Sequence, residues 1–157
     1  MAELVWTDDL NTGIEPIDLQ HRQIVTFINQ LHEAHLGGDR QAIGDVIDGL
    51  VEYTVSHFAF EETLMEDAGY EFVRPHKKVH ELFVRRVSEF HQRFKNGEPV
   101  EQALHELLAR WLFNHIRHDD ASYVGSVKAS MRQLTQETHE GGWLARSLGR
   151  FFGRKAA

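Results

Sequence analysis

The chain has 157 residues, of which 41% are hydrophobic and 26% charged, and its formal net charge is -7 at neutral pH. These values are typical of one soluble globular domain with a sizeable core, and the acidic balance argues against a general nucleic-acid binder. The absence of cysteine excludes disulfides and thiolate metal sites. The sequence also has no signal-peptide pattern and no apolar run of the roughly 18 residues that a membrane span needs, so we expect a cytoplasmic protein.

Four amphipathic helices are predicted in chain order, because apolar residues recur at steps of three and four and period-two alternation is absent. The predicted ranges are about 18–36, 40–68, Pro75 to the terminator Asn96-Gly97, and 100–134, with Gly37-Gly38 and Gly69 ending the first two helices. Short links between four such helices favour an up-down-up-down bundle. The predicted fold class is therefore all-α, with a four-helix bundle domain over residues 1–135.

Two predicted segments lie outside the four helices. Residues 1–17 are too broken by glycine and proline for a long helix, and we expect an N-terminal arm whose Trp6, Ile14 and Ile17 cover one end of the core. Residues 141–157 form a short amphipathic C-terminal extension, with apolar side chains on one side of a helical wheel and arginines on the other. Such an extension either docks on the bundle or hangs loosely from it, or it contacts a membrane surface or a membrane oxidase through residues 143–157.

Polar side chains recur on the apolar stripe of every predicted helix. The seven metal-competent groups are His21 in the first helix, His57 and Glu61 in the second, His76 and His80 in the third, and His115 and Asp120 in the fourth. Side chains four residues apart project about 40 degrees from one another on a helix, so one helix can present two ligands to one metal centre. A single buried histidine more often hydrogen-bonds a carbonyl or carboxylate. Recurrence on all four helices favours a metal centre, because unpartnered groups in a core would each cost on the order of 1–3 kcal/mol.

The ligand types limit the metal. Imidazole and carboxylate without thiolate suit iron, zinc, manganese or copper. Seven ligands exceed the needs of one tetrahedral zinc ion, so two ions that share the carboxylates, with one position open for a ligand, fit the count better. Ferritin-like di-iron sites use about four glutamates and two histidines. The more histidine-rich set here keeps more positive charge, which favours the ferrous state and reversible ligand binding over high-valent oxidation.

Together these motifs resemble the hemerythrin family, and specifically its bacterial members. The resemblance spans about residues 4–131 and is carried by HxxxE at 57–61, HxxxH at 76–80, WLFNHIRHDDASY at 111–123 and GIEPIDLQH at 13–21. It implies a non-haem di-iron centre with two oxo- or hydroxo-bridged iron ions. By the resemblance, His76, His80 and His115 ligate one iron, His21 and His57 ligate the other, which keeps a position open for O2, and Glu61 and Asp120 bridge the two.

The resemblance also implies a function. It is reversible O2 binding rather than turnover, for oxygen storage or for delivery to oxygen-requiring enzymes, by a protein that we expect to be a monomer and not an enzyme. Leu112 is similar to the family's O2-pocket leucine, and Ile116 and Trp111 are further candidates for an apolar lining, although ordinary core packing explains them equally well. Two alternatives stay open: a di-iron oxidoreductase that handles peroxide or nitric oxide, and an O2 sensor. The first would want an acid–base residue beside the open position, and the sequence offers no clear candidate.

The spacing of His115 and Asp120 does not suit a straight α-helix. Five residues rotate the second side chain about 140 degrees from the first, so Asp119 would be better placed. The family pattern H-x-x-x-x-D nevertheless selects Asp120, and we therefore predict a local widening of the helix such as a π-bulge. The remaining histidines match no ligand position and are predicted as surface or packing residues: His32, His35, His91, His105, His118 and His139.

Overall fold

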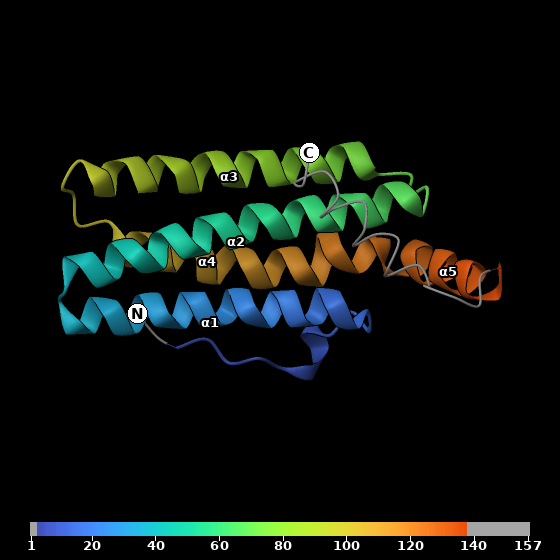
Figure 1. Ribbon diagram of the computed structural model, residues 1–157, viewed down its shortest axis with the longest axis horizontal. Helices are drawn as coiled ribbons and strands as arrows, with labels where there is room; N and C mark the ends of the chain where they lie inside the picture. The colour runs from blue at the N-terminus through green and yellow to red at the C-terminus, as the bar shows by residue number, and fades with distance from the viewer. Residues whose placement is uncertain (1–2, 138–157) are drawn as a thin grey trace.

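The computed structural model describes residues 3–137, which contain helices and no strand. The elements are η1 (Asp8–Leu10), α1 (Glu15–Gly37), α2 (Arg40–Asp67), α3 (Val73–Lys95), α4 (Glu101–His115), the π-helix η2 (Ile116–Asp120) and α5 (Ala121–Glu137). Because α4, η2 and α5 follow one another without a break, they form one rod, and residues 3–137 thus form four rods in up-down-up-down order (Figure 1). The predicted four-helix bundle is confirmed. The predicted extension at 141–157 and His139 lie outside the described residues.

The helix ends follow local sequence signals. Helix α1 begins three residues earlier than predicted, because Pro16 fits the first turn of a helix, where its missing N–H is not needed. It ends before Gly38, whose φ of 72° is the left-handed conformation that glycine adopts freely. At the start of α2, the side chain of Asp39 accepts a hydrogen bond from the backbone N–H of Gln41 at 3.0 Å.

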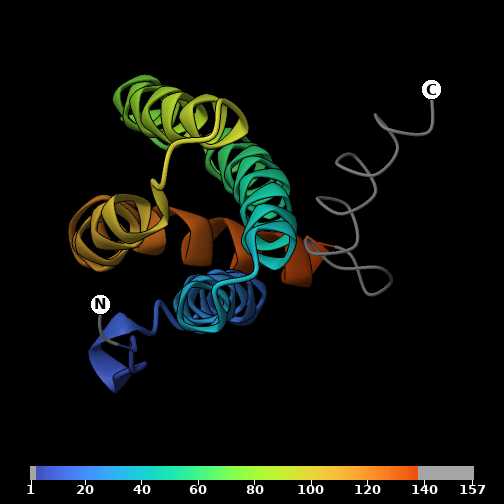
Figure 2. The ribbon, with the colours of Figure 1, turned by 90° about the vertical axis from the view of Figure 1, so that its left-hand side faces the viewer.

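Seen from the end, the four rods occupy the corners of a square, with α1 and α3 on opposite corners (Figure 2). The N-terminal arm runs back along α1 (Figure 1) and is fixed to it by two hydrogen bonds between the backbone of Leu4 and the side-chain amide of Asn29. Ile14 and Ile17 are fully buried in one apolar cluster, and Trp6 is half-buried against the other. The three residues are thus packed on the core, but they do not cover one end of it together as predicted, and Ile17 belongs to α1 and not to the arm. None of the described helices combines the length and the apolar character that crossing a membrane requires.

Two apolar clusters form the core, and a polar layer separates them. The larger cluster fills one end of the bundle and includes Ile24, Ile28, Phe58, Phe83 and Leu112, among others. The smaller cluster contains Ile14, Ile17, Phe60, Leu64, Met65, Tyr123 and Val127. On α1, for example, His21 lies between a residue of the smaller cluster, Ile17, and a residue of the larger one, Ile24. The bundle therefore buries its polar groups as one layer between two dry regions.

Candidate metal centre

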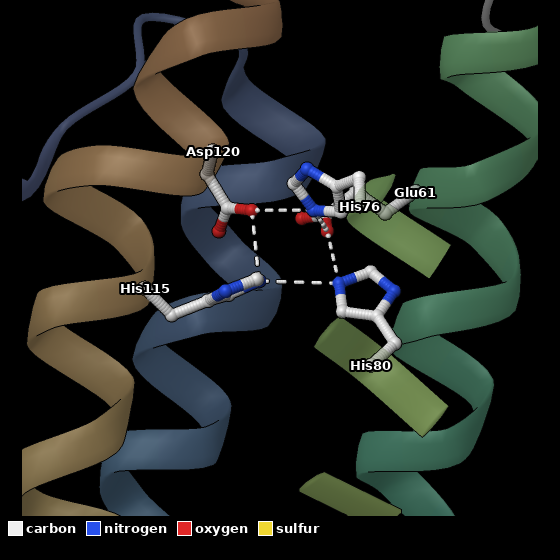
Figure 3. A group of neighbouring side chains, drawn as sticks. All are labelled: Glu61, His76, His80, His115 and Asp120. Carbon is white, nitrogen blue, oxygen red and sulfur yellow. Dashed lines mark hydrogen bonds and ion pairs between the residues drawn. The ribbon is translucent and has the colours of Figure 1, made fainter. Parts of the chain in front are cut away.

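The polar layer is made by the seven side chains that the sequence predicts as ligands. Each of them is at most 5% exposed. Their donor atoms form two groups, within each of which all atoms lie within 4.8 Å of one another: Glu61, His76, His80, His115 and Asp120 in the first, and His21, His57 and Glu61 in the second. Figure 3 shows the first group, in which side chains from α2, α3, α4 and η2 converge on one point. The two groups share Glu61, so the structure brings all seven residues into one cluster.

The two carboxylates divide their oxygens between the two sets of imidazoles. Oε1 of Glu61 lies 3.1 Å from Nε2 of His80 and 3.2 Å from Nε2 of His76. Its Oε2 lies 3.2 Å from Nε2 of His57 and 3.6 Å from that of His21. Such a split is the arrangement that a carboxylate needs to bridge two ions.

Asp120 divides its oxygens in the same way. Its Oδ1 lies 3.1 Å from Nε2 of His115 and 3.2 Å from Nε2 of His76. Its Oδ2 lies 3.1 Å from Nε2 of His21, in the other imidazole set. These separations also suit a metal, because two ligand atoms that are each about 2.1 Å from one ion and at right angles to each other lie ~3.0 Å apart.

The imidazoles of His80 and His115 face each other in a way that favours a cation between them. Nδ1 of His80 lies 3.0 Å from Oε1 of Glu62, and Nδ1 of His115 lies 2.8 Å from Oδ2 of Asp119. A carboxylate beside Nδ1 fixes the ring proton on that nitrogen, which leaves a lone pair on Nε2. The two Nε2 atoms are 3.1 Å apart. Burial lowers the pKa of His115, but the carboxylates of Asp120 and Asp119 outweigh burial and raise it to about 9, so without a metal a proton lies between the two Nε2 atoms. A metal ion would take the place of that proton.

The electrostatics of the cluster also call for positive charge. Burial lowers the pKa of His21, but the carboxylates of Asp120 and Glu61 outweigh burial and raise it to about 9. The same balance raises the pKa of His76 to about 9. Neither ring nitrogen of His21 and neither oxygen of Asp120 makes a well-aligned hydrogen bond within the described part of the chain. Their contacts therefore lack the geometry of a hydrogen-bonded ion pair, and they fit atoms that surround a common ion.

Sequence reasoning missed the residues behind the ligands. Besides Glu62 and Asp119, Gln20 lies with Oε1 2.7 Å from Nδ1 of His57. The buried hydroxyl of Tyr123 donates a hydrogen bond to Oε2 of Glu61 at 3.0 Å. Three of these four partners are adjacent in sequence to a predicted ligand. The outer partners could therefore have been predicted from the polar pairs Gln20-His21, Glu61-Glu62 and Asp119-Asp120.

Aromatic rings cover the side of the cluster with three imidazoles. The ring of Phe58 stacks on His80 at a centroid distance of 3.8 Å, and Trp111 stacks on His115 at 4.2 Å. Trp111 is half-buried, whereas Leu112 and Ile116 are buried in the larger apolar cluster. The role of these three residues as an O2 pocket stays a prediction. Their positions show that aromatic and apolar side chains pack directly against this side of the cluster.

The predicted local widening of the fourth helix is confirmed, because residues Ile116–Asp120 form a π-helix. The wider turn places Asp120 in the polar layer, where it is fully buried. Asp119 instead lies behind His115, with 43% of its side chain exposed. The π-helix thus gives the two adjacent aspartates different positions, one facing the cluster and one supporting a ligand from outside.

Comparison with known proteins agrees with this site. The family model described as the hemerythrin HHE cation binding domain matches residues 12–127. The chain belongs to the hemerythrin family. The bacteriohemerythrin of Pseudomonas aeruginosa strain LESB58 is 63% identical over 153 residues, which cover 98% of this chain and 100% of that protein. The bacteriohemerythrin of Stenotrophomonas maltophilia strain R551-3 is 56% identical over the same shares of the two chains.

A solved structure leads to the same fold. The crystal structure of wild-type hemerythrin matches with a TM-score of 0.76 and 34% identity, covering 80% of this chain and 98% of that one. Hemerythrins are known for binding O2 at a di-iron site, and the family therefore implies a di-iron centre in this chain. The clustered imidazoles and carboxylates fit that centre in number, donor type and spacing.

Proposed function

We propose that this hemerythrin binds O2 reversibly at a di-iron centre held by the seven clustered side chains, and that it stores O2 or delivers it to oxygen-requiring enzymes. The observation that carries the proposal is the unequal division of imidazoles around two shared carboxylates. His76, His80 and His115 lie on one side of the carboxylates, and His21 and His57 on the other. One metal position thus has one protein ligand fewer than its neighbour. That position is where a small ligand would bind.

The bound pair of irons would supply the two electrons that O2 takes up on binding and returns on release. The chain contributes ligands whose orientation is fixed from behind. Gln20, Glu62 and Asp119 each contact the Nδ1 atom of a ligand imidazole. This contact directs Nε2 toward the centre and limits rotation of the ring. These three ligand rings are thereby held in one geometry.

Tyr123 supports one of the carboxylates. Its hydroxyl group donates to Oε2 of Glu61 from a fully buried position. Burial and the negative charges of Glu61 and Asp120 hold the pKa of Tyr123 well above its usual value. The phenol therefore stays protonated and serves as a fixed hydrogen-bond donor.

The apolar packing around the cluster supports carriage over turnover. Leu112 and Ile116 are buried, and the stacked rings of Phe58 and Trp111 cover the imidazoles of His80 and His115. Of the groups that contact His57, Gln20 is an amide and Phe58 is apolar. The nearby hydroxyl of Tyr123 is bonded to Glu61, and its raised pKa makes it a weak proton donor. An oxidoreductase that reduces peroxide or nitric oxide would need a proton donor beside the open position. These surroundings favour a ligand that enters and leaves unchanged.

An optical experiment tests the proposal. Anaerobic protein loaded with ferrous iron is exposed to O2, and the charge-transfer absorption of the centre is followed in the visible range. We expect a band that forms with O2, disappears when O2 is removed under argon, and returns through repeated cycles. Rapid and irreversible conversion to the oxidised form in the first cycle would contradict carriage and would favour an oxidoreductase or a sensor.

A further inference from the structure

One of the clustered imidazoles, that of His76, borders on the surface of the bundle. With 5% exposure, His76 is the least buried of the seven clustered residues. It lines a hollow of about 110 Å³ between the start of α3 and the rod of α4, η2 and α5. On the inner side, Nε2 of His76 lies 3.2 Å from Oε1 of Glu61 and 3.2 Å from Oδ1 of Asp120 (Figure 3). The ring of His76 therefore stands between the hollow and both shared carboxylates.

His76 also lacks the outer support that most ligand imidazoles have. In three others, Nδ1 contacts the side chain of an outer partner: Gln20 behind His57, Glu62 behind His80 and Asp119 behind His115. Within residues 3–137, the polar contacts of the His76 ring are all made by Nε2. Nδ1 of His21 has no hydrogen-bond partner there either, but His21 is fully buried. His76 thus combines a missing outer partner with a position at the surface.

The place of His76 in its helix gives a second reason for movement. It is the fourth residue of α3, and Phe72, which precedes the helix, provides no side-chain cap. The backbone N–H of His76 donates the first α-helical hydrogen bond, to the carbonyl of Phe72 at 3.1 Å. Helix ends open locally at a lower cost in free energy than helix interiors. His57, by contrast, lies deep inside α2. His76 is therefore the ligand that moves at the lowest cost.

We propose that iron enters and leaves the centre through this hollow, with His76 as the ligand that turns aside. The inference rests on the di-iron centre of the proposed function and adds the route by which that centre exchanges its metal. Asp119 also lines the hollow, with 43% of its side chain exposed, so a carboxylate stands where a cation would arrive. Glu61 and Asp120 are fully buried and keep their places when His76 turns.

The test is the rate at which anaerobic protein loaded with ferrous iron releases it to an excess of a ferrous chelator. Ser122 is exposed on α5 and lines the hollow, so Ser122→Phe adds a ring there. We expect release to slow roughly three- to tenfold, because His76 then has less room to turn. Phe72→Ala removes an exposed ring from the lining and should speed release by a similar factor. Both variants keep all seven ligands, so iron per chain after loading should match the wild type.

The matched control is Ala129→Phe, which adds a ring at an exposed position of the same helix, about two turns beyond Ser122 and outside the lining of the hollow. It should release iron at the wild-type rate. Wild-type rates in both Ser122→Phe and Phe72→Ala, or equal slowing in Ala129→Phe and Ser122→Phe, would overturn the route. A wild-type chain that binds no iron would overturn the di-iron centre itself. Because loading is measured before release, the two failures are distinguishable.

Discussion

Helix α2 and the rod made by α4, η2 and α5 give the cluster the same chemical groups by different routes. Each supplies one histidine and one carboxylate whose oxygens face both sets of imidazoles. In α2 the two ligands, His57 and Glu61, are four residues apart in an α-helix without interruption. In the other rod His115 and Asp120 are five residues apart, and a π-helix absorbs the extra residue. The comparison shows that the position of the ligands determines the local form of the helix.

The outer partners explain why the second rod needs the extra residue. Glu62 of α2 supports His80, which belongs to α3. In the second rod Asp119 supports His115, which belongs to the same rod. The two residues are four positions apart, the spacing at which side chains on a helix contact each other. The carboxylate that enters the cluster comes from the next residue, Asp120. One rod thus supplies a clustered histidine, its outer support and a clustered carboxylate, and the wider turn gives the two aspartates their different positions.

The largest effect on iron content is expected from substitutions at the two adjacent aspartates, Asp119 and Asp120. In Asp120→Ala the centre loses a bridge whose oxygens face both imidazole sets, and we expect less than about a tenth of the wild-type iron to remain after dialysis, because removal of a bridge disturbs both ions. Elemental analysis measures the result. Asp119→Ala is the comparison, because it removes only the support behind His115 and leaves both clustered carboxylates in place, so it should keep more iron than Asp120→Ala but less than the wild type. The reverse outcome would mean that the position four residues from His115 supplies the bridge.

Next in size is the effect of the outer partners. Glu62→Gln and Asp119→Asn each replace the carboxylate behind one imidazole by an amide of the same shape. Both should weaken iron binding by about 10- to 100-fold, because the carboxylate raises the basicity of the ring and fixes its tautomer. The rate of iron loss to a ferrous chelator measures the effect. Similar losses in both variants would show that the support works equally from an α-helix and from a π-helix, whereas wild-type rates in both would remove the supporting role.

The sequence allowed the four helices and the seven clustered residues to be predicted, because both depend on periodicity. A ligand such as His57 is recognisable because it recurs at helical steps with apolar neighbours. The outer partners were missed because Glu62 and Asp119 lie on the flank of a helix, where the side chain looks solvated until the neighbouring rod is placed.

A smaller effect is expected at Tyr123, which supports Glu61 from α5. Tyr123→Phe removes the hydroxyl that donates to Oε2 of this carboxylate. We expect the metal-free protein to lose about 1.5–3 kcal/mol in its free energy of unfolding, the usual value for a hydrogen bond to a charged group. Urea unfolding measures it. Tyr53→Phe in α2 is the control, because Tyr53 is half-buried against the ring of Phe27, and its loss should be under about 0.5 kcal/mol. Equal losses in both variants would show that the contact with Glu61 contributes no stability.

The smallest effect is expected at the start of α2, where a substitution should change the stability of the helix without changing iron binding. Asp39 caps α2 through the backbone N–H of Gln41, whereas α4 begins after Val100 without any side-chain cap. Asp39→Ala should lower the free energy of unfolding by about 1 kcal/mol. The cap lies 18 residues before His57, about 27 Å along the axis, so iron content should not change. A variant that loses iron would show that fraying at this end of α2 reaches the ligands. The geometry of the ligands on α2 would then depend on the cap, as that of the second rod depends on its π-helix.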